Sequence, residues 1–176
     1  MRNKDICWMS ATDLTKAIKT KKLSPVEVIR TFLERIESVN PKINAYVTVT
    51  ADSALKEAKK AERKVMKGGK LGPLHGVPVS IKDLIFTKGV RTTFGSKLLE
   101  DFIPDEDAVI VSRLKKAGAI VLGKTNTSEF GFKPLTDNLV FGITRNPWNL
   151  ERSCGCARGG KSLGAQEAVS GLVLLY

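Results

Sequence analysis

The chain has 176 residues, 42% of them hydrophobic and 27% charged, which excludes overall disorder and matches the size of one ordinary domain. The formal net charge is +11, and most of the excess lies in residues 1–70, which hold 16 basic and 8 acidic residues. No apolar run approaches the roughly 18–20 residues that cross a bilayer, and no apolar signal region follows the N-terminus, so we expect a cytoplasmic protein.

The positive charge has two interpretations, a nucleic-acid surface or a set of solvated helix faces. The lysines and arginines between residues 56 and 67 recur with helical spacing, and no aromatic residue lies among them. A nucleic-acid surface is typically accompanied by a recognisable motif, which we do not find. We therefore favour solvated helix faces and expect no nucleic-acid or membrane partner. A basic, non-catalytic binding module stays open as an alternative.

The longest predicted helix has a complete set of start and stop signals. Ser24 is a typical N-cap, Pro25 suits the first helical position, and Glu27 completes a capping box. Apolar residues then recur every three or four positions as far as Asn40-Pro41. We expect the helix to end there, because proline lacks a backbone donor and restricts the preceding residue. A shorter helix is predicted after a similar cap at Ser10.

Two further elements are predicted before residue 70. Residues 43–49 alternate apolar and polar side chains, which indicates a short extended segment. A third helix runs from about Ala51 to Lys67 and ends at Gly68-Gly69. Such helices need a surface to pack on, so we predict that residues 1–70 form a helical segment against a separate core.

The pattern then changes to short apolar strands. Residues 77–81 predict a buried strand, and residues 119–122 predict a second one that ends at Gly123. A helix that closes at Gly118 is predicted between them. Strand, helix and strand with turn residues between them indicate an α/β core over residues 71–176.

Lys82 is a candidate functional residue because it stands at the end of the apolar strand 77–81. Burial disfavours the charged form of a lysine in such a position. A lysine held in its neutral form can act as a base that activates a nucleophile. A structural lysine, paired with a nearby acid or extended to the surface, is the alternative. The strand pattern by itself leaves both open.

Two other stretches are candidates for ligand binding. Gly123-Lys124-Thr125-Asn126 follows a predicted strand, at the end where α/β sheets place ligands, although it lacks the spacing of a phosphate loop. Glycines between residues 155 and 160 allow close backbone approach to a ligand, or form a plain flexible loop. Cys154 and Cys156 form a lone C-x-C without further ligands nearby. We therefore expect no metal and no cofactor.

Four long motifs, in this order along the chain, resemble the amidase signature family. They are Pro73-Leu74-His75-Gly76-Val77-Pro78-Val79-Ser80-Ile81-Lys82-Asp83-Leu84, Thr92-Thr93-Phe94-Gly95-Ser96, Gly123-Lys124-Thr125-Asn126-Thr127-Ser128-Glu129-Phe130-Gly131 and Phe141-Gly142-Ile143-Thr144-Arg145-Asn146-Pro147-Trp148-Asn149. The similarity covers about residues 10–153. It implies an α/β fold in which a mixed sheet is flanked by helices. We expect this chain to be the N-terminal part of that fold and therefore incomplete.

Members of this family hydrolyse or transfer amides with a Ser–cis-Ser–Lys triad, so the resemblance implies that Lys82 is the base and that a small amide is the substrate. The cis-serine belongs to a Gly-Gly-Ser-Ser-Gly-Gly segment. An ungapped count places Ala157 at the cis-serine, whereas a shift of four residues places Lys161 there and Ser162 at the second serine. Neither register gives an intact motif, and Ser162 is the remaining serine candidate.

The family's nucleophilic serine lies in a later Gly-Gly-Ser loop, and the chain ends at Tyr176 before any such loop. We therefore expect a truncated and inactive amidase, unless a C-terminal complementing chain supplies the serine. Within the family, Asn126-Thr127-Ser128-Glu129-Phe130 favours a hydrolase over the A subunit of a tRNA-dependent amidotransferase, which tends to have Asn-Met-Asp-Glu-Phe there. A fragment of such a protein stays open as the alternative.

Overall fold

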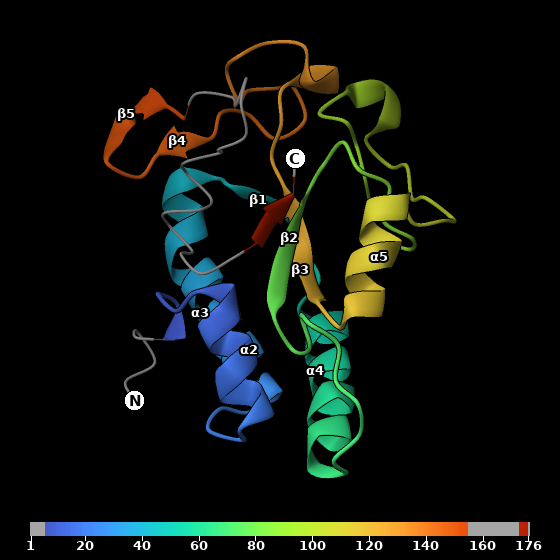
Figure 1. Ribbon diagram of the computed structural model, residues 1–176. Coiled ribbons are helices and arrows are strands. Elements are labelled where there is room, and N and C mark those ends of the chain that lie inside the picture. The colour runs from blue at the N-terminus through green and yellow to red at the C-terminus, as the bar shows by residue number, and fades with distance from the viewer. Residues whose placement is uncertain (1–5, 155–172, 176) are drawn as a thin grey trace.

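The computed structural model describes residues 6–154 and 173–175 (Figure 1). Among these residues, a mixed sheet lies between the N-terminal helices on one side and helix α5 on the other. The elements, in chain order, are α2 (Ala11–Lys19), α3 (Pro25–Ile43), β1 (Tyr46–Val49), α4 (Ala51–Met66), β2 (Pro78–Lys82), η1 (Lys97–Leu99), α5 (Val109–Ala117), β3 (Ile120–Thr125), η2 (Glu129–Gly131), β4 (Arg145–Asn146), β5 (Asn149–Ser153) and β6 (Val173–Leu175).

The main sheet has the strand order β1-β3-β2-β6. Strand β2 runs parallel to both of its neighbours, and β1 runs antiparallel to β3. The expectation of an α/β fold with a mixed sheet is therefore confirmed. Strand β1 comes from the first 70 residues, so this part of the chain contributes a strand to the sheet as well as helices. The division of the chain near residue 70 stays a prediction.

The larger apolar core lies between the sheet and helices α2, α3 and α4. The cap signals of the sequence form as predicted: the Ser24 hydroxyl accepts from the Val26 amide at 2.9 Å, and the Glu27 carboxylate accepts from the Ser24 amide at 3.5 Å. Ser10 caps α2 in the same way, accepting from the Asp13 amide at 3.1 Å. These bonds satisfy amides that a helix N-terminus otherwise leaves unpaired.

The predicted end of α3 at Asn40-Pro41 is wrong, because the helix continues through Pro41 to Ile43. It ends at Asn44, whose backbone is left-handed and whose amide donates to the Asn40 carbonyl at 2.8 Å. The Asn40 side chain then accepts from the amides of Ala45 and Tyr46, at 2.9 and 2.8 Å. A proline in the last turn costs one helical bond, and this cap compensates for the loss.

The predicted end of the second strand at Gly123 is also wrong, because β3 continues to Thr125. The pairing with β2 shifts at this point: Val79 pairs with Val121, but Ser80 pairs with Gly123. A Cβ atom at Gly123 would lie 2.1 Å from the Thr48 carbonyl oxygen of β1. The glycine therefore allows the close approach of a bulged strand and does not end it.

The described residues include no helix that is long and apolar enough to cross a membrane.

Candidate active site

Lys82 is the last residue of β2, in the interior of the four-stranded sheet. The other residues of the strand are buried, and Lys82 is partly exposed. Because side chains alternate along a strand, Lys82 shares a face with Ser80, opposite the face of Ile81 that packs towards α5. No hydrogen bond or ion pair joins the Lys82 side chain to any residue within 6–154.

The neighbour of Lys82 on its own face is a pair of buried hydroxyl groups. Tyr46 of β1 reaches across β3, and its hydroxyl shares a hydrogen bond with the Ser80 hydroxyl. Burial raises the pKa of Tyr46, and the bond to Ser80 opposes that shift only in part, so the phenol stays neutral. Lys82 thus has hydroxyls as neighbours on this face, and the described residues offer it no carboxylate in an ion pair.

Asp83 fixes the loop that begins directly after Lys82. One of its carboxylate oxygens accepts from the Thr93 amide at 3.0 Å and from the Thr93 hydroxyl at 2.6 Å. Its backbone carbonyl accepts from the Phe94 amide at 3.0 Å, and its own amide donates to the Thr125 carbonyl at 2.9 Å. Burial raises the pKa of Asp83, opposed by the Thr93 bonds and the charge of Lys124. Among the described residues its second carboxylate oxygen, Oδ1, has no hydrogen-bond partner.

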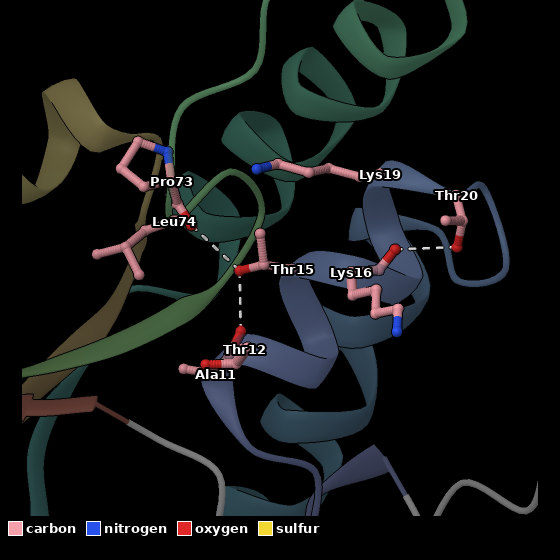
Figure 2. A pocket seen from close by; sticks show the side chains of 8 residues that line it. All are labelled: Ala11, Thr12, Thr15, Lys16, Lys19, Thr20, Pro73 and Leu74. Atoms are coloured by element: carbon pink, nitrogen blue, oxygen red, sulfur yellow. Dashed lines mark hydrogen bonds between the residues drawn. The ribbon is translucent and has the colours of Figure 1, made fainter.

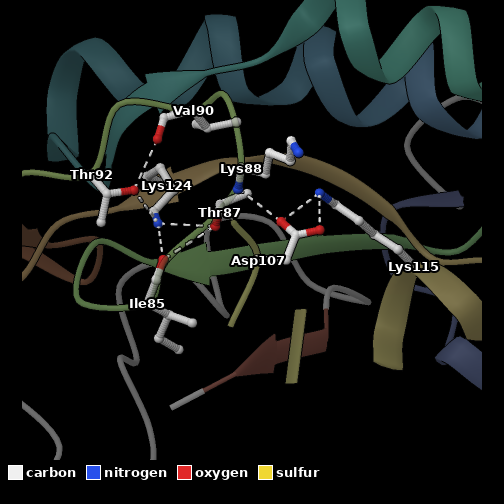
Figure 3. A network of polar contacts seen from close by, with 8 residues as sticks. All are labelled: Ile85, Thr87, Lys88, Val90, Thr92, Asp107, Lys115 and Lys124. Carbon is white, nitrogen blue, oxygen red and sulfur yellow. Dashed lines mark hydrogen bonds and ion pairs between the residues drawn. The ribbon is translucent and has the colours of Figure 1, made fainter. Parts of the chain in front are cut away.

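Lys124 is fully buried, although it belongs to a stretch that the sequence suggested for ligand binding. Figure 3 shows its amine donating to the Ile85 carbonyl, to the Thr87 hydroxyl at 3.1 Å and to the Thr92 hydroxyl at 2.9 Å. Burial lowers the pKa of Lys124 to about 8, against the opposing charges of Asp83 and Asp107. All three donors of the ammonium are occupied by protein oxygens, so this lysine holds structure and is closed to a ligand.

A second polar network joins two of the motifs identified in the sequence. The Asn126 amide group donates to the Thr144 hydroxyl at 2.9 Å and to the Gly142 carbonyl at 3.2 Å. Asn138 donates to the Asn126 side-chain oxygen at 2.7 Å, and the Thr144 hydroxyl donates to the Asn44 carbonyl at 2.6 Å. The end of β3, the following loop and the end of α3 are therefore fixed to one another beside the end of β2.

A groove of about 530 Å³ lies between α2 and the segment at Pro73 and Leu74 (Figure 2). The Thr15 hydroxyl in it donates to the carbonyls of Ala11 and Pro73, at 2.8 and 3.3 Å. The Thr20 hydroxyl donates to the Lys16 carbonyl at 2.9 Å. Because these hydroxyls already have partners and Lys82 does not line the groove, we assign it no role in catalysis.

The serine candidate of the sequence, Ser162, lies outside the described residues, as do Ala157, Lys161 and Cys156. Cys154 is buried. Within residues 6–154 and 173–175, no group of three or more histidine, cysteine, aspartate or glutamate side chains is arranged to hold a metal ion. The structure thus places Lys82 and leaves the position of the candidate serine a prediction.

The sequence model of the amidase family matches residues 27–171. The chain belongs to the amidase family. Among solved structures, an aryl acylamidase of the amidase signature enzymes superposes with a TM-score of 0.82 at 34% identity, over 92% of this chain and 33% of that one. Fatty acid amide hydrolase superposes with a TM-score of 0.85 at 30% identity, over 95% of this chain and 29% of that one.

The curated relatives of this amidase-family chain include two kinds of protein. The A subunit of glutamyl-tRNA(Gln) amidotransferase from Carboxydothermus hydrogenoformans is 49% identical over 170 residues, 96% of this chain and 35% of that protein. An acylamidase from Rhodococcus erythropolis is 43% identical over 170 residues, 97% of this chain and 35% of that protein. The chain therefore spans about a third of the length of these relatives. The preference for a hydrolase over an amidotransferase component stays a prediction.

Proposed function

We propose that this chain is the lysine-bearing part of an amide-hydrolysing enzyme, with Lys82 as the base of a Ser–cis-Ser–Lys triad. The observation that carries the proposal is the position of the Lys82 amine. It stands at the end of an interior strand, partly buried, with no partner within residues 6–154. An amine in that state can accept a proton without first breaking an ion pair.

The chemistry proceeds in two steps. Neutral Lys82 takes a proton from the cis-serine hydroxyl, which takes one from the nucleophilic serine, and that serine oxygen bonds to the amide carbon. The tetrahedral oxyanion collapses, the C–N bond breaks, and the proton returns through the same hydroxyls to the leaving nitrogen. Water then hydrolyses the ester and releases the acid. No described residue is placed as either serine, so we propose that residues 155–172 or a second polypeptide supply them.

A component of a tRNA-dependent amidotransferase is the second candidate, favoured by the 49% identity to a protein of that kind. It would use the same acyl chemistry on a donor amide, but the ammonia released would be passed to an acceptor. The two candidates differ in the amide that they cleave and in what becomes of the released ammonia. A hydrolase cleaves simple aliphatic or aryl amides by itself, whereas an amidotransferase component releases ammonia from an amide donor for an acceptor in a complex.

The test measures amide cleavage by the purified chain, alone and mixed with the polypeptide that corresponds to the remaining two thirds of the Rhodococcus acylamidase. We expect no turnover by the chain alone and turnover in the mixture, lost in Lys82→Ala and kept in the exposed control Lys60→Ala. Turnover that survives Lys82→Ala contradicts the role of the lysine. Turnover by the chain alone that Ser162→Ala abolishes shows instead that Ser162 serves as the nucleophile.

A further inference from the structure

We infer that Lys124 is a positioning residue for Lys82: its buried ammonium fixes the turn after β2 and thereby sets the direction of the Lys82 amine. The inference rests on the proposed function of Lys82. It assigns a role to a lysine that the proposed chemistry does not use. The side chain of Lys124 lies on the face of the sheet that packs towards α5, away from Lys82, so its effect passes through the backbone.

The connection consists of two successive hydrogen bonds. The Ile85 amide donates to the Lys82 carbonyl at 3.0 Å and closes a turn directly after the strand. The Ile85 carbonyl in turn accepts from the Lys124 amine. Each end of the Ile85 residue is therefore bonded, one to Lys82 and one to Lys124. A displacement of the Lys124 amine must change the turn that carries the Lys82 backbone.

The other two acceptors of Lys124 extend this support along the same loop. The hydroxyls of Thr87 and Thr92 belong to the segment between Ile85 and Thr93, and Thr93 is bonded to Asp83. Residues 83–93 are thus held at both ends and in the middle, as Figure 3 shows for the part around Lys124. A methionine at position 124 would fill similar space without the cost of burying a charge, but it would donate to none of these oxygens.

Lys82 depends on this support because its own side chain has no fixing contact. Within residues 6–154 it forms no hydrogen bond or ion pair, so the path of its backbone decides where the amine lies. Its backbone lies against one neighbouring strand: Ile81 and Lys82 pair with Lys124 and Thr125 of β3. A triad base has to stand within hydrogen-bond reach of its partner hydroxyl, and a small misplacement lowers the rate strongly.

The experiment measures how fast each lysine of the full chain is acetylated by trace acetic anhydride, as a function of pH, with the products identified by peptide mass spectrometry. In Lys124→Met we expect the rate at Lys82 to rise several-fold, towards that of exposed Lys116, because the turn opens. Lys60 reports general exposure and stays unchanged. Lys60→Met, with an exposed lysine removed, is the matched control and leaves Lys82 at its wild-type rate.

If Lys124 only stabilised the fold, the folded Lys124→Met variant would have a changed thermal stability and an unchanged acetylation profile at Lys82. That result would overturn the inference. If Lys124→Met does not fold, Thr92→Val removes one acceptor and keeps the charge. We then expect a smaller rise at Lys82, and no rise overturns the inference. Labelling requires no turnover, so amide cleavage that survives Lys82→Ala defeats the proposed function without altering this result.

Discussion

Lys82 and Lys124 stand at nearly the same level of two neighbouring strands, and their surroundings are opposite. Lys82 is partly exposed on the face it shares with Ser80, and it has no bonded partner within residues 6–154. Lys124 is fully buried on the other face, and three oxygens accept from its amine. An ammonium whose donors are all accepted is held in place by its bonds, whereas a side chain without such bonds is directed by its backbone alone. The two lysines therefore differ in what holds each amine in place.

The largest effect is expected at Lys82, and it concerns rate alone. In the complemented mixture, Lys82→Ala should lower turnover by on the order of 10³ or more, since the members of a triad act as a unit. The free energy of unfolding should change by no more than about 0.5 kcal/mol, because a partly exposed side chain without partners contributes little. Steady-state rates measure the loss of turnover, and urea unfolding measures the change in stability. A large loss of stability would place Lys82 with Lys124 as a structural residue.

The next effect concerns Gly123, which lies beside Lys124 on β3. A Cβ there would lie 2.1 Å from the Thr48 carbonyl oxygen. Gly123→Ala must therefore separate β1 from β3, and we expect a cost of about 3 kcal/mol or more. Gly69→Ala is the matched control, since the atoms nearest to its Cβ would be those of Lys64, at 3.5 Å or more, which is ordinary van der Waals contact. Equal unfolding midpoints for the two variants would show that the bulge can relax.

The same bulge explains why the environment of Lys124 could not be predicted from the sequence. Leu122 and Lys124 are two residues apart, and strict alternation would place them on one face of the sheet. The shift in pairing at Gly123 interrupts the alternation of side chains between the two faces. Lys124 therefore pairs with Ile81 and lies on the face towards α5. A single extra residue moves every later side chain to the other face. From the sequence alone, Gly123 indicated only the end of the predicted strand 119–122.

Features governed by neighbouring residues were predictable. The capping box of Ser24 and Glu27 and the Ser10 cap depend on residues three apart, and both form. The strand before Lys82 was predicted from its apolar run, and with it the place of the lysine. The end of α3 could not be predicted in this way, because the cap at Asn44 depends on the hydrogen bonds of Asn40 to the start of β1. Bonds between separate elements leave little trace in local sequence.

The pH dependence of stability tests the buried environment of Lys124. Burial lowers the pKa of Lys124 from 10.5 to about 8. Between these pH values the unfolded chain binds a proton that the folded chain has released, so the free energy of unfolding rises with pH. Relative to Lys124→Met, which lacks this group, the wild type should gain up to about 3 kcal/mol across the window. Urea unfolding at several pH values measures the difference. A constant difference would mean that Lys124 does not titrate there.

The smallest effect is expected at the hydroxyl pair on the Lys82 face. Tyr46→Phe leaves the Ser80 hydroxyl buried without its partner, and Ser80→Ala does the same to the Tyr46 hydroxyl. Each should cost about 1–2 kcal/mol, because a buried polar group that loses its bond keeps its full cost of desolvation. The double variant removes both groups and should lose less than the sum of the single variants, which a double-mutant cycle in urea measures. Strictly additive losses would mean that the two hydroxyls are not coupled. Ser80, the buried residue nearest to Lys82 on the same face of β2, would then be held in place by packing alone.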